Sequence, residues 1–548
     1  MSEPAVDIRP EKIMAVDPWY WATQHRIRLG ANEYALKGHA YQVEIMQSND
    51  RKRVYKKAAQ LGFTQIEILK TIHGMTYGHY PVGVMYLFPT ADDVSDFTKA
   101  RFNPLIKDNY EAIGQYVRDT DSATIKRIGQ AMLYLRGARS TSKVEGLKKD
   151  AAKLRSAPVD KLIFDERDLM EHEMVTLALE RISHSSVQEV VEFSTPTIPD
   201  YGVDKTYQQS DQRIWVHKCK KCRKEQCLEM EFPNCIGELS DGTRYRACVR
   251  CGNELIPDEG QWVAQYPGKE WAGWWISQLN SSYVDPGYIL DLYNDPPNGN
   301  IQEVYNSKLG MAYIAAENRL TANDVYSCCS RDAMEGKSKR INAMGVDVGS
   351  ELNVLIGRLG SAGKIKVVYA ARLSDFNDLH DLAKRFNVKV AVFDMYPETR
   401  KVRDFQAAED FEVYLCAYRE DLKGGEKIDE RNGEMVAART EICDRSHDIV
   451  SKGAIDFPRR SPEMEIVAQQ MTAIAKVLEK KADTGLNVYR YRKLGADHYR
   501  HSLNYLVLAI DQCRSAMESE EKYIEARTFP KDQEEDYNPL RAGLGREE

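Results

Sequence analysis

Apolar and polar residues along positions 52–204 follow a pattern that predicts strands and helices in turn. Short apolar runs of strand length are separated by longer segments, and the first of these is typical of a helix with Ile66, Ile68 and Leu69 as apolar residues. Strands that alternate with helices favour an α/β fold with a mostly parallel sheet. The strands expected from this pattern cover residues 53–55, 83–88, 131–135, 161–164 and 190–193.

A second α/β pattern begins at Ile341. Its expected strands cover residues 343–348, 354–358, 365–369 and 388–393. Two or three consecutive antiparallel strands, then a helix and a parallel strand, are typical of the ribonuclease H fold. We expect a closing helix over about 497–513, and a disordered tail at 516–548, which has 10 acids and 5 bases and few apolar residues.

A candidate phosphate-binding loop follows the first expected strand. The standard motif G-x-x-x-x-G-K-[ST] is absent, but the segment KAAQLGFT places Lys57, Gly62 and Thr64 at positions one, six and eight of that motif. A lysine at the start of such a loop can still neutralise β- and γ-phosphate oxygens. Thr64, at the helix N-terminus, would hold Mg²⁺, and backbone N–H groups would cradle the phosphates. Taken alone, the octet also fits a basic turn between a strand and a helix.

Three further segments strengthen this interpretation. The expected strand at 161–164 runs into Asp165 and Glu166, which could hold Mg²⁺ through water and polarise an attacking water, respectively. Residues 194–197, Ser-Thr-Pro-Thr, follow the next strand, as a motif that couples hydrolysis to movement would. Tyr41 and Gln42 precede the loop at the distance where many such ATPases carry an aromatic ring and a glutamine that read adenine.

The order and spacing of these motifs resemble one family. The segments are K-x-A-Q-x-G-x-T with Gln60 as its glutamine, YLFPTADDVSDFTKARFNPLI at 86–106, IFDE at 163–166 and STPTI at 194–198. Together they resemble the large terminase subunit of tailed phages, of the lambda type, over roughly residues 17–515. The resemblance implies an ATP-driven DNA-packaging motor fused to a DNA-cutting nuclease, with ATP and Mg²⁺ or Mn²⁺ as cofactors.

The resemblance also implies partners and a domain plan. The expected partners are double-stranded DNA, the portal protein of the procapsid, the small terminase subunit and further copies in a ring on the portal, in the host cell cytoplasm. We expect a P-loop ATPase domain of the RecA/ASCE type with a zinc-ribbon insertion, followed by a ribonuclease H-like nuclease domain. The boundaries are 1–36 (N-terminal segment, a small-subunit contact), 37–204 (ATPase), 205–265 (zinc ribbon), 266–335 (rest of the ATPase domain and linker), 336–515 (nuclease) and 516–548 (tail).

An arginine is still needed to complete the ATPase site. Residues 136–155 carry seven basic residues against Glu145 and Asp150, which fits either a solvated face or a surface facing DNA or another subunit. Arg155, just before the strand that ends in Asp165, is our candidate for a finger that reaches the γ-phosphate of a neighbouring subunit.

Two C-x-x-C pairs predict a metal site. Cys219 and Cys222 are separated from Cys248 and Cys251 by 25 residues. Each tight knuckle offers two thiolates to one ion, the arrangement of a structural Cys₄ zinc site. Basic residues in both knuckles and Gly252 after the second fit a zinc ribbon. The site is closed, so we interpret it as structural.

Three aspartates predict a second catalytic site. Asp347 lies on the first strand of the second block, Asp394 ends a later strand, and Asp497 opens the last helix. Ribonuclease H-like nucleases need three carboxylates from these elements to bind two divalent ions. His501 lies four residues after Asp497, on the same helical face, where it would tune that acid, touch phosphate or lie at the surface.

Composition adds exclusions more than assignments. The chain has 548 residues, 76 Lys and Arg and 83 Asp and Glu, a net charge of −7, so DNA contacts would depend on local basic surface. No run of 18 apolar residues appears, so we expect no membrane span, and the N-terminus lacks the pattern of a secretory signal. Eleven cysteines are too sparse for a disulfide scaffold.

Two alternative functions remain open from the sequence. One is a helicase-type or chromatin-remodelling DNA-dependent ATPase, but the block at 341–515 lacks the arginine motif of a second RecA-like domain. The other is a zinc-ribbon DNA-binding scaffold with a degenerate phosphate loop. DNA-stimulated ATP hydrolysis and metal-dependent DNA cleavage would separate these interpretations from a packaging ATPase with a nuclease.

Overall fold

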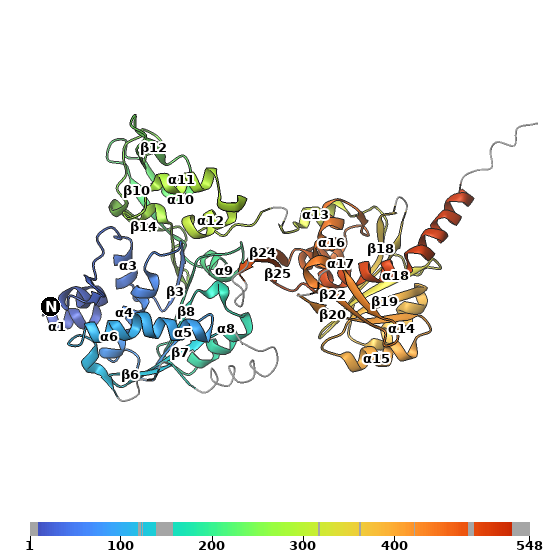
Figure 1. Ribbon diagram of the computed structural model, residues 1–548, viewed down its shortest axis with the longest axis horizontal. Coiled ribbons are helices and arrows are strands. Elements are labelled where there is room, and N and C mark those ends of the chain that lie inside the picture. The colour runs from blue at the N-terminus through green and yellow to red at the C-terminus, as the bar shows by residue number, and fades with distance from the viewer. Residues whose placement is uncertain are drawn as a thin grey trace, which may run out of the picture. The chain divides into compact units, whose positions relative to one another are not determined.

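The computed structural model of the chain describes residues 9–118, 122, 124–138, 157–315, 318–360, 363–420, 422, 424–480 and 487–528. The chain divides into two compact units, Met1–Ile314 and Ala315–Glu548 (Figure 1). Each unit has its own β-sheet and its own hydrophobic core.

The N-terminal unit is built on a sheet that has eleven strands over the described residues. At one side, the sheet is extended by two antiparallel strands, β6 (Ile125–Ile128) and β5 (Val117–Arg118). At the other side, β10 (Arg213–Lys218) joins the sheet in parallel, and β14 (Gly260–Ala264) and β11 (Glu225–Cys227) pair with β10 antiparallel. The five strands expected from the apolar runs are confirmed. The centre is parallel, in the order β15 (Ala272–Ile276), β3 (Lys52–Lys57), β9 (Glu189–Ser194), β8 (Lys161–Asp165), β4 (Gly83–Phe88) and β7 (Ala131–Gly137).

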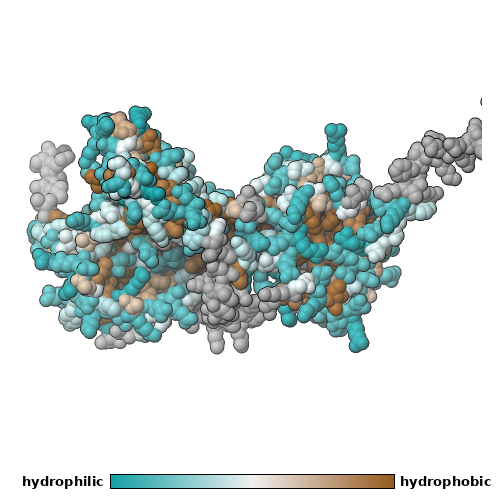
Figure 2. Space-filling view, turned by 45° about the horizontal axis from the view of Figure 1, so that its top comes forward, coloured by the Kyte–Doolittle hydropathy of each residue, from teal (hydrophilic) through white to brown (hydrophobic). Residues whose placement is uncertain are grey.

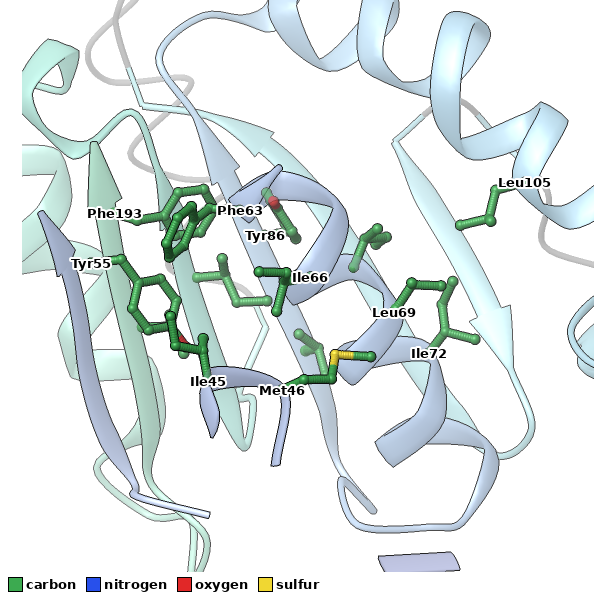
Figure 3. Packing of buried hydrophobic residues seen from close by; sticks show 14 of the residues in the cluster. Ile45, Met46, Tyr55, Phe63, Ile66, Leu69, Ile72, Tyr86, Leu105 and Phe193 are labelled. Carbon is green, nitrogen blue, oxygen red and sulfur yellow. The ribbon is translucent and has the colours of Figure 1, made fainter. Parts of the chain in front are cut away.

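Helices cover both faces of this sheet. In β8, Ile163 belongs to the apolar cluster under α4, whereas Leu162 and Phe164 pack with α8 on the other face. Figure 3 shows Ile66 and Leu69 of α4 among the buried side chains of the first face. This alternation is what a strand buried on both faces requires. In the part of this unit that the structure describes, the α-helices are α1 (Pro10–Val16), α2 (Pro18–Gln24), α3 (Gln42–Gln47), α4 (Phe63–Thr76), α5 (Ala91–Phe97), α6 (Asn103–Asp108), α8 (His172–Leu179), α9 (Gly202–Gln209), α10 (Leu228–Glu231), α11 (Pro286–Asn294) and α12 (Ile301–Leu309).

Four charged side chains are buried together near the amino ends of the parallel strands. Lys161 Nζ lies 3.1 Å from Glu67 Oε2 and 3.0 Å from Glu189 Oε1, and Arg53 Nη2 lies 2.6 Å from the same Glu189 oxygen. Burial alone would raise the pKa of Glu67, but Lys161 and Arg53 lower it to about 2. Because buried charges persist only when paired, the network fixes α4 against β3, β8 and β9.

A small module with six cysteines is inserted between β10 and β14. It contains β11, α10 and the hairpin of β12 (Ile236–Glu238) and β13 (Arg244–Arg246). After β14 the chain enters the sheet as β15, passes through the short turn Gln278–Asn280, and then forms α11 and α12. The module therefore leads directly back to the strand beside β3.

The C-terminal unit is built on a sheet of eight strands in its described part. The strand β17 pairs antiparallel with both β16 and β18, whereas β19, β20 and β22 continue from β16 in parallel. The four strands expected from the sequence are confirmed. The sheet order is β21 (Glu426–Asp429), β22 (Glu434–Ala438), β20 (Glu412–Arg419), β19 (Val388–Asp394), β16 (Asn342–Val348), β17 (Leu352–Leu359), β18 (Ile365–Leu373) and β23 (Ile455–Asp456).

A separate hairpin and six α-helices complete the described part of this unit. The hairpin strands β24 (Ile474–Lys480) and β25 (Asn487–Lys493) pair along their whole length and lead directly into the last helix. The helices are α13 (Ala322–Ser327), α14 (Phe376–Arg385), α15 (Thr399–Ala408), α16 (Arg439–Ser451), α17 (Pro462–Met471) and α18 (His498–Thr528).

The helix α18 crosses the sheet in very close contact with β16. A Cβ atom at Gly345 would lie 2.2 Å from the backbone nitrogen of Leu506 and 2.3 Å from the carbonyl oxygen of Ser502. Glycine at this position is therefore required by the helix, not by a turn. The contact brings the start of α18 beside the end of β16.

The predicted end of the last helix and part of the predicted tail are wrong. At Cys513 the backbone leaves helical geometry, but α18 continues to Thr528. Met517 is buried in the core, and Arg340 Nε lies 3.6 Å from Glu520 Oε2, so tertiary contacts order a segment whose composition predicts disorder. Residues 529–548 of the predicted tail lie outside the described residues.

The visible surface is mostly hydrophilic in both units, with scattered apolar residues (Figure 2). In the part of the chain that the structure describes, no helix is both long enough and apolar enough to span a membrane.

Candidate functional site

The predicted phosphate loop lies between β3 and α4. Gln60 and Gly62 have φ values of 58° and 81°, left-handed conformations that turn the chain from strand to helix. A Cβ at Gly62 would lie 3.0 Å from Nε2 of Gln42, so the loop is also closely packed there. Thr64 is the second residue of α4, which places its hydroxyl at the helix N-terminus, as expected.

Lys57 and Glu166 form an ion pair at the carboxyl edge of the sheet. Lys57 Nζ lies 2.8 Å from Glu166 Oε1. The strand β9 separates β3 from β8, and Phe193 of β9 is level with Tyr55 of β3 and with Asp165 of β8. The ends of the three parallel strands therefore coincide, and the displaced lysine reaches the acidic pair.

Asp165 and Glu166 are adjacent carboxylates in different electrostatic environments. Burial, and then the Glu166 charge, raise the pKa of Asp165 to about 7, although Lys57 and a hydrogen bond with Thr64 oppose this. The Tyr86 hydroxyl donates to Asp165 at 3.0 Å. Burial also acts to raise the pKa of Glu166, but the Lys57 ammonium and its hydrogen bond outweigh burial and lower it. A cation beside Asp165 and Thr64 would favour the ionised carboxylate.

The segment after β9 holds the acids in place. Ser194 Oγ donates to Glu166 Oε2 at 2.9 Å, and the backbone N–H of Thr195 lies 3.3 Å from the same oxygen. Asp168, which the sequence analysis did not single out, accepts hydrogen bonds from the backbone N–H and the hydroxyl of Thr197 at 2.8 and 2.9 Å. The Ser-Thr-Pro-Thr motif is thus hydrogen-bonded to Glu166 and to Asp168, the two ends of the segment 166–168.

Tyr41 and Gln42 contact the phosphate loop from inside the protein. Gln42 Nε2 donates to the carbonyl of Leu61 at 2.7 Å. The Tyr41 ring is fully buried and packs against Phe63 and Trp215. The ring has no exposed face, and both residues support the loop by these contacts.

Arg155, our candidate for the arginine finger, lies outside the described residues, as do the other basic residues from 139 to 153. Arg136, at the start of the same basic segment, donates to the carbonyl of Thr124 at 2.9 Å.

The four predicted cysteines converge. Cys219 Sγ lies 3.6 Å from Cys251 Sγ, and Cys222 Sγ lies 3.6 Å from Cys248 Sγ. All four sulfur atoms lie within 4.8 Å of one another. Four thiolates bound to one ion at about 2.3 Å in tetrahedral geometry require sulfur separations close to these. The other two cysteines of the module, Cys227 and Cys235, are buried and hydrogen-bond elsewhere.

The three predicted aspartates belong to adjacent elements. Val346 pairs with Phe393 in the parallel ladder of β16 and β19, so the following residues, Asp347 and Asp394, lie side by side near the ends of neighbouring strands. Asp497 immediately precedes α18, which packs on β16. Among the described residues, the four cysteines form the only group of three or more ligands gathered within 4.8 Å, so the aspartates are more loosely arranged.

Basic side chains of the chain itself face these aspartates. His498 Nδ1 lies 2.8 Å from Asp347 Oδ2, and this contact raises the pKa of His498. Lys493 Nζ lies 2.8 Å from Asp497 Oδ1, and His501 Nε2 lies 3.2 Å from Asp497 Oδ2. His501 therefore contacts Asp497, one of the roles expected for it. The sequence analysis missed Lys493 and His498.

Comparison with known proteins identifies the N-terminal unit. A family model described as phage terminase large subunit gpA, ATPase domain, matches residues 33–271. No curated protein sequence matches the chain.

Comparison with solved structures shows the fold. The large terminase of bacteriophage HK97 is 10% identical, with a TM-score of 0.50, and the alignment covers 90% of this chain and 99% of that one. The large terminase of a thermophilic bacteriophage is 11% identical, with a TM-score of 0.30, over 86% of this chain and 98% of that one. The sheet with β9 between β3 and β8 is thus a P-loop-type ATPase fold. The predicted resemblance to large terminase subunits is confirmed, and the matching family model, that of the terminase large subunit ATPase domain, covers residues 33–271.

Proposed function

We propose that the chain hydrolyses ATP at the carboxyl edge of β3, β9 and β8 in order to move double-stranded DNA into a procapsid. The observation that carries this proposal is the ion pair of Lys57 and Glu166, 2.8 Å apart, beside Asp165 and Thr64. A phosphate-binding lysine, a metal-binding acid and a second acid for the attacking water are the minimum set for phosphoryl transfer to water.

In the proposed reaction, the ion pair is exchanged for contacts with the substrate. Lys57 has its charge neutralised by Glu166, so neither group is free to act. When the triphosphate enters, Lys57 would turn to its β- and γ-oxygens, and Glu166, still held by Ser194, would be released to orient water. Asp165 and Thr64 would hold Mg²⁺, which neutralises charge on the phosphates when bound.

The mechanical part of the proposal rests on family membership. The ATPase domain supports DNA, the portal protein of the procapsid and the small terminase subunit as partners, further copies of the chain in a ring on the portal, and action in the host cell cytoplasm. The contacts from Glu166 to Ser194 and from Asp168 to Thr197 support a role for residues 194–197 in linking hydrolysis to movement.

We expect Lys57→Ala and Glu166→Gln each to lower ATP turnover by about a hundredfold or more, because each removes a group that acts on the transition state. Steady-state phosphate release from purified protein measures this. Lys56→Ala is the matched control, because the Lys56 ammonium pairs with Asp204 at 2.8 Å, away from the acids. Wild-type turnover by a folded Lys57→Ala protein would show that the loop is assigned wrongly.

We further propose that the C-terminal unit is a ribonuclease H-like, metal-dependent DNA endonuclease. The strand order, three antiparallel strands continued by parallel ones, supports this fold. Asp347, Asp394 and Asp497 would bind two divalent ions, which activate water and stabilise the leaving oxygen when bound. Burial, and to a lesser extent the charge of Asp347, raise the pKa of Asp394 to about 6. Carboxylates that crowd one another in this way fit a site built for cations.

Asp347→Ala should remove DNA cleavage and leave ATP hydrolysis near the wild-type rate, because the ATPase residues all lie in the other unit. Plasmid nicking in millimolar-scale Mg²⁺ or, better, Mn²⁺ measures the cleavage, since Mg²⁺ gives up its water reluctantly. Asp429→Asn, at an exposed position of the same unit, should cleave normally. Metal-dependent cleavage that persists in folded Asp347→Ala protein would place the catalytic acids elsewhere.

The four cysteines are proposed to hold one structural Zn²⁺ ion. The sulfur separations of 3.6 Å fit tetrahedral coordination, and Cys219 and Cys248 are buried, as in a closed site. The ion would supply folding energy to a module that has only short strands and a four-residue helix of its own.

Protein purified without chelator should contain one zinc per chain by elemental analysis. Cys248→Ser should lose the metal and make residues 205–265 sensitive to protease, because three thiolates bind zinc far more weakly than four. Cys235→Ser is the control, since this buried thiol donates to the carbonyl of Leu228 instead of joining the cluster. Zinc-free wild-type protein with an intact module would refute the assignment.

A further inference from the structure

The phosphate loop is held by two segments that lie far from it in sequence. Gln278 Nε2 donates to the carbonyl oxygen of Ala59 at 2.9 Å, and the backbone N–H of Ala59 donates to the carbonyl oxygen of Ser307 at 2.9 Å. Ser307 is in the last turn of α12, where carbonyl groups lack partners within the helix. Both polar backbone groups of Ala59 are therefore satisfied from outside the loop.

The same two segments pack against the cysteine module. Leu279, next to Gln278, and Leu309, two residues after Ser307, are fully buried in one apolar cluster with Cys219 and Cys248. A movement of the cysteines would thus displace both supports of Ala59, because close-packed clusters transmit displacement.

Polar contacts fix the turn around Gln278 to the module more firmly. Arg246, two residues before Cys248, donates through its guanidinium to the carbonyls of Leu279, Ser281 and Val284, the last two at 2.8 and 2.7 Å. Arg246 is 9% exposed. A rigid guanidinium fork that binds three carbonyls gives this turn one geometry.

Glu229 of α10 holds the same turn from its other side. Its Oε1 accepts a hydrogen bond from the backbone N–H of Ser277 at 2.8 Å and one from Asn280 Nδ2 at 2.7 Å. Glu229 is 2% exposed, so both contacts are shielded from water. The residues on either side of Gln278 are therefore anchored by side chains of the cysteine module, one acidic and one basic.

We propose that Gln278 is a positioning residue for the phosphate loop, and that the cysteine module sets the affinity of this loop for nucleoside di- and triphosphates through Arg246 and Glu229. The inference rests on the proposed binding of ATP at the loop. A loop whose backbone is already ordered binds phosphate without a further ordering cost, whereas a loop that has lost the Gln278 contact must be ordered by the ligand. The module is then part of the nucleotide site, although none of its residues touches the nucleotide.

The test compares Gln278→Met with the wild-type full-length protein. Methionine has a similar length but no donor, so the Ala59 carbonyl loses its partner. Equilibrium titration with a fluorescent ADP analogue and Mg²⁺ should show affinity weakened roughly three- to tenfold, the effect of one hydrogen bond. The KM for ATP should rise more than kcat falls, and the zinc content should remain at the wild-type value.

Arg246→Met tests the role of the module, with Arg244→Met as its matched control. Arg244 lies two residues earlier on the same strand but ties the hairpin to α11 through Asp291. We expect weaker ADP binding with zinc retained for Arg246→Met, and wild-type affinity for Arg244→Met.

Three results would contradict the inference. Wild-type ADP affinity in Gln278→Met would overturn the positioning role of Gln278. Wild-type ADP affinity in a folded Arg246→Met protein would overturn the proposed role of the cysteine module. If Arg246→Met does not fold, Glu229→Met tests the same point, because it removes the acceptor of Ser277 and Asn280: weaker ADP binding would support the role of the module, and wild-type affinity would overturn it. Failure of the wild-type protein to bind ADP at all would overturn the proposed ATPase function and this inference with it.

Discussion

The ion pair of Lys57 and Glu166 is the interaction on which the account of this protein depends. It forms only because β9 lies between β3 and β8 and the three strands end at the same level. That order places Lys57, the displaced lysine of the phosphate loop, opposite the acids at the end of a strand more than a hundred residues later in the sequence. Near the opposite edge of the sheet, the buried ion pair of Glu67 and Lys161 holds α4 against β8. This contact keeps the phosphate loop before α4 beside the acids after β8.

The second unit obeys a comparable constraint. The close approach of α18 to β16 at Gly345 carries Asp497 toward the strand end that holds Asp347. Basic side chains lie beside these carboxylates, Lys493 at Asp497 and His498 at Asp347. In both units, therefore, a basic side chain lies next to acids of a proposed metal-dependent site.

The sequence predicted the parts of the fold that depend on local pattern. Long apolar runs such as 83–88 and 388–393 are strands because a strand buried on both faces has no polar positions. The run 272–276 escaped notice, since Ala-Gly-Trp-Trp-Ile is short and its strand character comes from the neighbouring β3 and β10. The helical segment after Cys513 was missed for a similar reason, because contacts with distant residues order it.

In the candidate sites, too, local pattern predicts some residues and distant contacts determine the others. Strand ends and knuckle spacing indicate Asp165, Glu166 and the four cysteines. The roles of Asp168 and Gln278 depend on hydrogen bonds to residues 29 and 219 positions away, which no local pattern records. The burial of the Tyr41 ring is likewise a property of the whole core, which its distance from the loop in sequence does not reveal.

The most direct test of the central claim is a crystal structure of the full chain with Mg²⁺ and a non-hydrolysable ATP analogue. The account predicts that Lys57 leaves Glu166 and contacts the β- or γ-phosphate, with Mg²⁺ near Thr64 and Asp165 and with Glu166 facing a water molecule beside the γ-phosphate. A structure in which the analogue binds elsewhere, or binds while Lys57 remains paired with Glu166, would contradict it.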